Sequence, residues 1–279
     1  MIIAFHGDAD GICSAALLAI WAREKGKKIK LISPRSVTLP EIRATEVYVL
    51  DIGKKAEIRA RKVVWIDHHE PFEPEPGWDY INPRVWGRNR PTSLLVHEKF
   101  GGPSWIAYIG AVSDAYRPSI KVEYPPALLR GLIPILNASR AYGKQVKAVK
   151  LLMKNDPKFI IDRELVSVYN RVEEEVMEIL KNPPKKMGPF VLLEFESEHY
   201  ISNYVAGKLK RIYGGIGVAA NRYKGTYEVE MRTDLGVDLR ELVKPWGGGH
   251  EKAAGATIPE ESWREFLNRL KNFGNSFKG

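Results

Sequence analysis

Short hydrophobic runs alternate with longer amphipathic segments along the first half of the chain. The runs Met1 to Phe5, Lys30 to Ser33, Val47 to Asp51 and Lys62 to Asp67 have the length and composition of buried strands. An apolar stretch rich in Ala and Leu over residues 12–21 is long enough to form a helix. Strands that alternate with helices at this spacing predict an α/β fold with a parallel sheet and helices on its faces.

The middle of the chain is predicted to be mainly helical. The segments Leu128 to Tyr142 and Gln145 to Met153 have helical patterns, and we expect Pro134 and Gly143 to break them. Charged residues flank an apolar stripe from Arg163 to Lys181, as in an amphipathic helix, and two prolines follow it. We interpret this helix as a connector between two domains, and the alternative is that it is the last helix of the first domain.

The remaining residues predict a second, smaller α/β domain. Its expected strands lie over residues 190–195, 217–223 and 227–232, and its expected helices over 200–213 and 262–273. A Gly-rich loop over 247–250 is predicted to open a helix at Glu251. A chain of 279 residues exceeds the usual size of one domain. The expected organisation is therefore a first domain over 1–155, a helical connector over 156–185 and a second domain over 186–279.

Composition narrows the class of protein. The chain has one cysteine, Cys13, which excludes a disulfide framework within the monomer and a Cys-rich zinc module. The chain reaches an acidic residue within its first eight positions, where a signal peptide is basic and apolar. No apolar run reaches the roughly 20 residues of a membrane span. We therefore expect a cytoplasmic protein. The formal charge of +9 favours polyanionic partners, although a solvated Lys- and Glu-rich surface is an equally good interpretation.

Acidic residues and histidines follow the predicted strand ends. They are His6, Asp8, Asp10, Asp51, Asp67, His68, His69 and Asp114, and we take Asp114 to follow a fourth strand. A lone Asp at such a place is usually a helix cap or turn residue. The carboxyl ends of parallel strands, however, meet at one edge of the sheet. Carboxylates gathered there repel one another unless cations neutralise them.

The donor set indicates which ions would fit. Carboxylate and imidazole groups without a thiolate suit Mn²⁺, Mg²⁺ or Co²⁺ better than structural zinc. Two such ions about 3.5–4 Å apart stabilise the attacking and leaving oxygens in phosphoryl transfer and lower the pKa of a bound water. The sequence thus predicts a phosphoesterase with two metal ions.

Five segments resemble a known family. The runs His6-Gly7-Asp8-Ala9-Asp10-Gly11, Asp51-Ile52-Gly53, Asp67-His68-His69 and Ser113-Asp114 resemble the four successive motifs of the DHH phosphoesterase superfamily. The run from Gly247 to Gly255 resembles the signature of the C-terminal domain associated with DHH proteins. This Gly-rich loop is similar to that of RecJ-like nucleases and nano-RNases and differs from the family's inorganic pyrophosphatases. The compact size and the Lys- and Glu-rich composition resemble an archaeal RecJ-like nuclease.

The resemblance implies a metal role for each motif. The implied ligands are Asp51 as the bridge between two Mn²⁺ ions (Mg²⁺ or Co²⁺ being the alternatives), Asp10, His68 and Asp114 for one ion, and Asp8 with His6 for the other. Many relatives carry a histidine where Ala4 stands here. We therefore expect the second ion to be held more weakly, by His6, Asp8, Asp51 and water. Asp67 is expected to orient a ligand, and His69 to face the substrate phosphate.

The second domain is expected to grip the substrate. Backbone N–H groups of Gly248 and Gly249, the side chain of His250 and the positive end of the helix predicted at Glu251 are candidates for a phosphate site. The resemblance adds Arg232, which ends a predicted strand as the phosphate-gripping arginine of relatives does.

Other candidates near the site are weaker. Trp86, Tyr116 and Trp246 are candidates for stacking a terminal base, with core packing expected for at least one of them. For Arg84 a solvated position is the expected one, and for Arg140 a place on a helix face.

Three functions remain open. The leading one is an exonuclease that releases mononucleotides from single-stranded DNA or RNA, with 3′→5′ polarity favoured by analogy with archaeal relatives. The second is a phosphodiesterase or phosphatase for short oligonucleotides, cyclic dinucleotides or 3′-phosphoadenosine 5′-phosphate. The third is an inactive scaffold in replication or repair, and a helicase or another replication or repair protein is a candidate partner. The complete ligand set argues against the scaffold.

Overall fold

The chain forms two sheets, each in its own unit. The computed structural model describes residues 1–35 and 38–276, and the division between the units falls between Asn170 and Arg171. This division lies inside α6 (Arg163–Ile179), within the segment that the sequence predicts as a connector.

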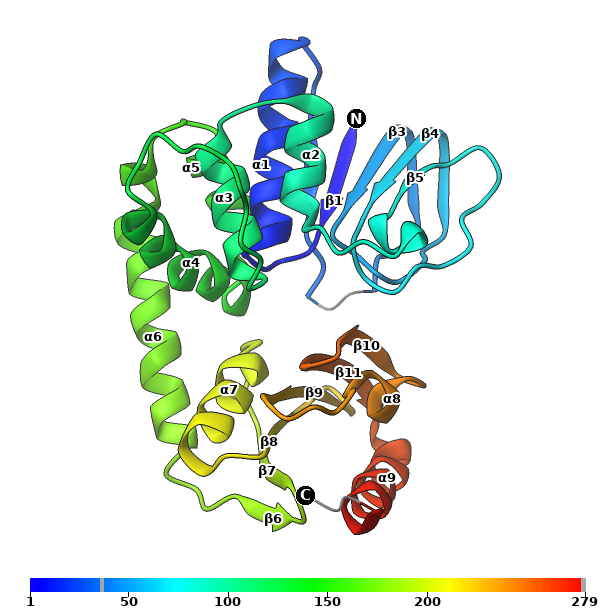
Figure 1. Ribbon diagram of the computed structural model, residues 1–279, viewed down its shortest axis with the longest axis vertical. Helices are drawn as coiled ribbons and strands as arrows, with labels where there is room; N and C mark the ends of the chain where they lie inside the picture. Colours follow the sequence, from blue (N-terminus) through cyan, green and yellow to red (C-terminus); the bar gives the residue numbers. More distant parts are fainter. Residues whose placement is uncertain (36–37, 277–279) are drawn as a thin grey trace. The chain divides into compact units, whose positions relative to one another are not determined.

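Five parallel strands make up the sheet of the first unit (Figure 1). In spatial order they are β2 (Lys30–Ile32), β1 (Ile2–Phe5), β3 (Ile42–Leu50), β4 (Ile58–Ile66) and β5 (Asp79–Ile81). The chain order reverses at β1, which pairs with β2 on one side and β3 on the other. Ligand sites of open α/β sheets form outside the carboxyl ends of the strands at such a switch point.

Helices cover one face of this sheet. The face carries Phe5, Leu50 and Ile66, which pack into one core with α1 (Ala9–Glu24), α2 (Thr92–Phe100) and α3 (Ser104–Ser113). Among the described residues, the opposite face is packed by loop aromatics instead of helices: Trp65 stacks on Trp78 with ring centroids 5.5 Å apart. The parallel α/β sheet is therefore confirmed, but the prediction of helices on both faces is wrong for the described residues.

The remaining described helices complete the first unit, and the prediction that Pro134 breaks one of them is wrong. They are η1 (Pro83–Trp86), α4 (Pro126–Ala141), α5 (Gln145–Leu152), η2 (Pro157–Ile160) and the first part of α6. Pro134 lies inside α4 and does not break it. A proline there costs about 3 kcal/mol because it removes a backbone hydrogen bond. Burial of Leu132 and Leu136 on either side of it offsets that cost.

The second unit contains a mixed six-stranded sheet. In spatial order its strands are β10 (Gly247–His250), β11 (Ala253–Pro259), β9 (Thr226–Thr233), β8 (Ile216–Tyr223), β7 (Phe190–Phe195) and β6 (Lys185–Met187). The helices are α7 (Ser202–Tyr213), α8 (Arg240–Val243), η3 (Glu260–Ser262) and α9 (Trp263–Ser276).

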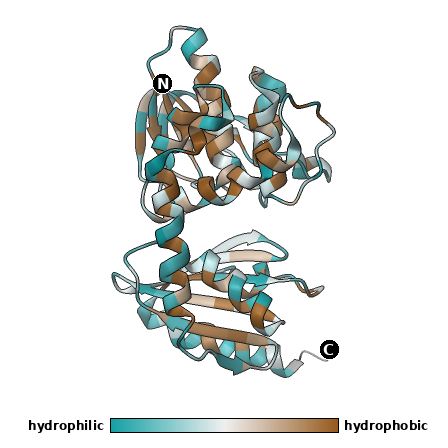
Figure 2. Cartoon of the chain, turned by 90° about the vertical axis from the view of Figure 1, so that its left-hand side faces the viewer, coloured by the Kyte–Doolittle hydropathy of each residue, from teal (hydrophilic) through white to brown (hydrophobic). Residues whose placement is uncertain are grey.

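The core of the second unit lies between its sheet and α9. Phe266 and Leu270 of α9 pack against Val229 and Met231 of β9. The strands differ in hydrophobicity: β7 (FVLLEF) is largely hydrophobic, whereas β9 carries several polar and charged residues. Hydrophobic and hydrophilic residues alternate along α6 (Figure 2). This architecture agrees with the predicted α/β fold of the C-terminal part. In the described part of the chain, no helix combines the length and the hydrophobicity that crossing a bilayer requires.

Candidate metal centre

The turn after β1 places two aspartates at the start of α1. Asp8 is the N-cap residue, and its Oδ1 accepts a hydrogen bond from the Gly11 N–H (3.0 Å). A Cβ at Gly11 would lie 2.3 Å from the His6 carbonyl oxygen, so this tight turn requires glycine. His6 Nδ1 lies 2.8 Å from Asp8 Oδ2. Burial lowers the pKa of His6, but the carboxylates of Asp8 and Asp51 outweigh it and raise this pKa to about 9.

Asp10 is held by the N-terminus of another helix. Its carboxylate is fully buried and accepts hydrogen bonds from the backbone N–H groups of Thr92 (2.8 Å) and Ser93 (3.1 Å), at the start of α2. The positive end of a helix favours a negative charge at this place. Gly110 of α3 makes room for it, because a Cβ there would lie 2.6 Å from Asp10 Oδ1. Asp10 is therefore fixed in the crevice before any ion binds.

Asp51, directly after β3, is central to the cluster. It is 1% exposed, and its backbone has a φ of 62°, in the left-handed region that few residues other than glycine, Asn and Asp adopt. Its carboxylate lies 3.2 Å from His68 Nε2 and 3.6 Å from His6 Nδ1. It also accepts a hydrogen bond from the Thr92 hydroxyl (3.0 Å). One carboxylate thus connects the first and third sequence motifs.

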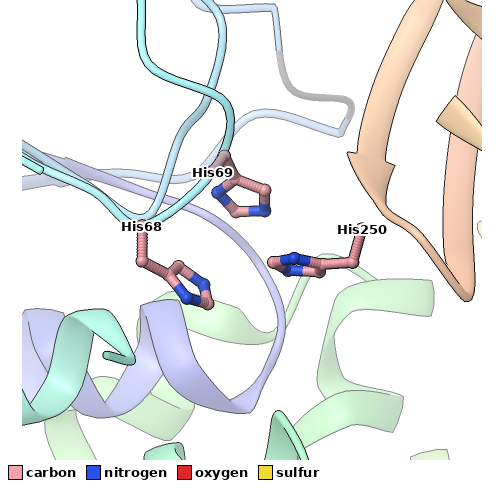
Figure 3. Close-up of side chains that lie close together, drawn as sticks. All are labelled: His68, His69 and His250. Atoms are coloured by element: carbon pink, nitrogen blue, oxygen red, sulfur yellow. The ribbon is translucent and has the colours of Figure 1, made fainter. Parts of the chain in front are cut away.

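The end of β4 carries Asp67, His68 and His69. The two imidazole rings follow the strand in succession, with centroids 4.9 Å apart (Figure 3). Asp67 Oδ1 lies 2.7 Å from His69 Nδ1, and Asp67 Oδ2 accepts a hydrogen bond from the His69 N–H (3.1 Å). Burial raises the pKa of Asp67, but His69 more than compensates, and the net shift is downward. Asp67 therefore orients the His69 ring.

Asp114 reaches the cluster from a helix and not from a strand. The prediction of a strand before it is wrong, because Ser104–Ser113 form α3 and Asp114 is the C-cap residue. The segment is apolar on nearly all sides, and its periodicity does not distinguish a buried helix from a buried strand. Asp114 Oδ2 nevertheless lies 3.0 Å from His68 Nε2.

The first unit brings all eight predicted strand-end residues together. Three groups have potential ligand atoms within 4.8 Å of one another: His6, Asp8 and Asp51; Asp10, His68 and Asp114; and Asp51, Asp67 and His69. The first two groups contain the ligand sets that the sequence resemblance implies for two ions. Their donors are carboxylate oxygens and imidazole nitrogens, which suit Mn²⁺, Mg²⁺ or Co²⁺.

Electrostatics at the cluster also favour a bound cation. Burial raises the pKa of Asp10 well above its usual range, and the charges of Asp51 and Asp114 add to the effect. Burial raises the pKa of Asp114 too, although His68 counteracts it. The pKa of His68, which burial lowers, is raised well above its usual value by Asp114 and Asp51. The carboxylates repel one another, and protons bound to the carboxyl and imidazole groups take the place of a cation. A divalent ion would relieve that repulsion.

Sequence reasoning missed the residues that support the ligands. Thr92 and Ser93 belong to α2, for which the sequence analysis predicted no helix, and their contacts to Asp10 and Asp51 are long-range. The sequence does carry a signal for the start of this helix, since Pro91, Thr92 and Ser93 directly precede an apolar run. Arg140 was expected on a helix face, and it does lie on α4, with its side chain against Gly7 and its Nη2 donating to the Arg35 carbonyl (3.0 Å).

The Gly-rich segment of the second unit is a strand. The prediction of a helix at Glu251 is wrong, because Gly247–His250 form β10, which pairs antiparallel with β11 after a turn over 251–252. Glycine has a low strand propensity, and only the long-range pairing with β11 reveals the strand. β10 is an edge strand of the sheet, so alternate backbone N–H groups along it point outward from the sheet edge. Gly248 is exposed there, and His250 is the last residue of β10 (Figure 3).

Arg232 lies in register with His250 across β11. Ala253 pairs with both residues, which places their side chains on one face of the sheet. The Arg232 Nη1 donates to Glu230 Oε2 (2.8 Å) and to the Met231 carbonyl (2.8 Å). The phosphate-binding candidates therefore lie on two strands that are separated by β11: Gly248, Gly249 and His250 on β10, and Arg232 on β9. Arg232 already has an acidic partner.

Two of the three aromatic candidates are packed into cores. Tyr116 packs against the first core, and Trp246 packs edge-on against Phe266 and beneath Arg269. Trp86 is 67% exposed. The expectation of a solvated Arg84 is wrong: its Nε donates to the His68 carbonyl (2.6 Å), because η1 directs it back to the end of β4.

Family models match both units of the chain. The model of the "DHH family, N-terminal domain" matches residues 1–99, and the model of the "DHHA1 domain" matches residues 190–275. A search of curated protein sequences finds no match.

Solved structures share the fold. RecJ from Thermus thermophilus in complex with Mn²⁺ aligns with a TM-score of 0.71 and 17% identity, over 99% of this chain and 52% of that one. The chain therefore spans about half the length of that protein. An exonuclease RecJ bound to manganese aligns with a TM-score of 0.63 and 16% identity, over 99% and 90% of the two chains. A pGpG-specific phosphodiesterase from Vibrio aligns with a TM-score of 0.54 and 17% identity, over 99% of both.

Proposed function

Because the chain belongs to the DHH superfamily, with a DHH domain followed by a DHHA1 domain, we propose that it is a metal-dependent exonuclease on single-stranded DNA or RNA. The observation that carries this proposal is the convergence of His6, Asp8 and Asp51, and of Asp10, His68 and Asp114, within 4.8 Å in each group. We propose two Mn²⁺ ions for these groups. When bound, such ions supply an activated water and stabilise charge on the reacting phosphate.

The side chains of the first unit have separate tasks in this proposal. Asp51 is the shared ligand, since its carboxylate faces both His6 and His68. Thr92 holds Asp51 by its hydroxyl and Asp10 by its N–H, so that both carboxylates keep their orientation as the charge of the site changes. The ring of His69, oriented by Asp67, is the group assigned to the substrate phosphate.

The second unit is proposed to supply phosphate binding. The exposed edge of β10, which contains Gly248 and Gly249, offers alternate backbone N–H groups, and glycine permits close approach of an oxyanion. Arg232 and His250 share a face of the sheet and add a guanidinium and an imidazole donor. Release of mononucleotides with 3′→5′ polarity is the mode that we propose.

A second candidate function is favoured by one observation. The chain aligns over 99% of the Vibrio pGpG-specific phosphodiesterase but over only 52% of Thermus RecJ. Hydrolysis of dinucleotides or other short substrates is therefore the alternative.

One assay separates these functions. The substrates are 5′-labelled DNA and RNA of 2, 5 and about 20 nucleotides in Mn²⁺, and Asp51→Asn serves as the inactive control. Stepwise shortening of the longest substrate supports the exonuclease, whereas cleavage of the dinucleotide alone supports the alternative. Absence of hydrolysis with any divalent ion would refute both.

A further inference from the structure

An exposed indole lies close in sequence to the metal-ligand segment. Trp86 is 67% exposed and Val85 is 56% exposed, and both belong to the short helix η1. The other large apolar side chains recorded as exposed in the first unit, Leu128 and Ile161, lie elsewhere, in α4 and after η2. Single exposed apolar side chains are common on protein surfaces, but two adjacent ones on a short helix close to the metal-ligand segment form a candidate contact for a ligand.

The residues before Trp86 are anchored to the end of β4. Asn82 is 1% exposed, and its Nδ2 donates to the His69 carbonyl (3.0 Å), while its Oδ1 accepts from the Arg84 N–H (3.0 Å). Arg84 Nε donates to the His68 carbonyl (2.6 Å). Trp86 follows two residues later, about 4 Å along the axis of a 3₁₀ helix. Its backbone is thus fixed relative to the two histidines.

The surroundings of the indole are basic. The segment 82–91 contains three arginines and no acidic residue. A cavity of about 310 Å³ beside it is lined by Glu70, Pro71, Arg84, Gly87, Arg88 and Asn89. Glu70 is the one carboxylate among these lining residues. An exposed aromatic ring on a segment that also carries arginines matches a nucleotide, because such a ring can stack on a base and the cations can face its phosphates.

We propose that Trp86 is a stacking platform for one nucleobase of a single-stranded substrate, with Arg84 and Arg88 beside its phosphates. The inference rests on the proposed function, since it places a base next to the residues assigned to hydrolysis. A protein partner is disfavoured, because two side chains offer far less than the about 800 Å² that a stable interface buries on each partner.

The test compares three variants on a pentanucleotide. Trp86→Ala removes the ring, Trp86→Phe keeps an aromatic face, and Val85→Ala is the matched control that removes the neighbouring exposed apolar side chain. We expect Trp86→Ala to raise KM by about 5-fold to 150-fold, as for loss of one stacked base. Trp86→Phe should recover most of this loss, and Val85→Ala should change KM less than twofold.

Substrates with one abasic position identify the stacked base. If Trp86 stacks on the base at that position, removing the base should raise the KM of the wild type as much as Trp86→Ala does. It should not raise the KM of the Trp86→Ala variant further. Independent effects of the variant and of every abasic position, or a KM within twofold of wild type for Trp86→Ala, would overturn the inference.

Binding without turnover separates this inference from the proposed function. Fluorescence anisotropy with the labelled pentanucleotide in EDTA gives Kd for the same variants. If the wild type cleaves no oligonucleotide but Trp86→Ala still weakens binding at least fivefold, the proposed hydrolysis fails and the stacking platform stands. If cleavage occurs and neither KM nor Kd responds to Trp86→Ala, the platform fails and the hydrolysis stands.

Discussion

At the scale of single residues, Asp51 and the side chains around it determine whether the site can bind metal. Its left-handed backbone (φ 62°) costs energy in most residue types, and its carboxylate is buried among His6, His68 and Thr92. A strained, buried carboxylate among other ionisable groups is what a cation site requires and what a structural core avoids.

Replacing Asp51 by Asn should abolish activity and leave the fold intact. Asn adopts the left-handed region readily and keeps an oxygen that accepts from the Thr92 hydroxyl, but it lacks the charge. We expect kcat to fall about 100-fold or more. Circular dichroism should show a native spectrum. A rate near that of the wild type would remove Asp51 from the site.

Thr92 and Ser93 allow a matched comparison of two buried hydroxyls. The Thr92 hydroxyl donates to Asp51, whereas the Ser93 hydroxyl donates to the Ala107 carbonyl. Thr92→Val should therefore weaken Mn²⁺ binding about 10-fold to 100-fold, as for loss of a group that orients a ligand. The Ser93 side chain also contacts Asp10, but it makes no contact with the shared ligand Asp51, so Ser93→Ala should weaken Mn²⁺ binding to a smaller extent than Thr92→Val. Titration calorimetry measures both, and equal affinities in the two variants would contradict the role of Thr92.

At the scale of elements, the sequence predicted the strands better than what surrounds them. The strands β1, β3 and β4 and the charged residues at their ends follow from local patterns, because a buried strand and the polar residue after it are contiguous. Neither the helix that leads to Asp114 nor the strand β10 can be predicted from local patterns. The apolar α3 fits helix and strand equally well, and Gly247–His250 become a strand only by pairing with β11.

The start of α6 offers a test of helix capping and of pH dependence. Asp162 accepts hydrogen bonds from the Glu164 and Leu165 N–H groups, and its Oδ1 lies 2.6 Å from Lys147 Nζ. The hydrogen bond from Lys147 lowers the pKa of Asp162. Because the folded-state pKa is depressed, its contribution to stability is present above the unfolded-state pKa and is lost as the pH falls through the folded-state value.

Asp162→Asn keeps a capping oxygen and loses the ion pair. At pH 7 we expect this variant to be less stable than the wild type by about 0.5 kcal/mol, since the pair is partly exposed. Asp162→Ala also loses the cap and should cost about 1 kcal/mol more. Urea denaturation at pH 7 and near pH 3 measures the differences. A gap between the wild type and Asp162→Asn that does not narrow at low pH would refute the ion-pair contribution.

At the scale of the whole molecule, the net charge and the length of the chain bear on how many phosphates of a nucleic acid it can bind. A formal charge of +9 on 279 residues favours capture of polyanions. Each phosphate contact with a single strand releases counterions, so binding weakens linearly on a log–log scale with salt, with a slope of about −0.7 for each phosphate.

Salt dependence therefore counts the phosphates that the chain contacts. If the protein holds three or four nucleotides of a single strand, the affinity should fall with a slope of about −2 to −3 against log salt. A dinucleotide should give a slope of magnitude below about 1. Anisotropy titrations in EDTA between low and physiological salt measure both substrates. Equal, shallow slopes would favour the small-substrate function over the exonuclease.

The most direct test of the metal centre is a crystal structure with Mn²⁺, recorded on both sides of the manganese absorption edge. Anomalous scattering locates the ions independently of any assumption about the site. We predict two peaks beside Asp51, one also bonded to Asp10, His68 and Asp114 and the other to His6 and Asp8. Absence of anomalous density among these residues at saturating Mn²⁺, with their side chains directed apart, would contradict the assignment of this chain as a two-metal phosphodiesterase.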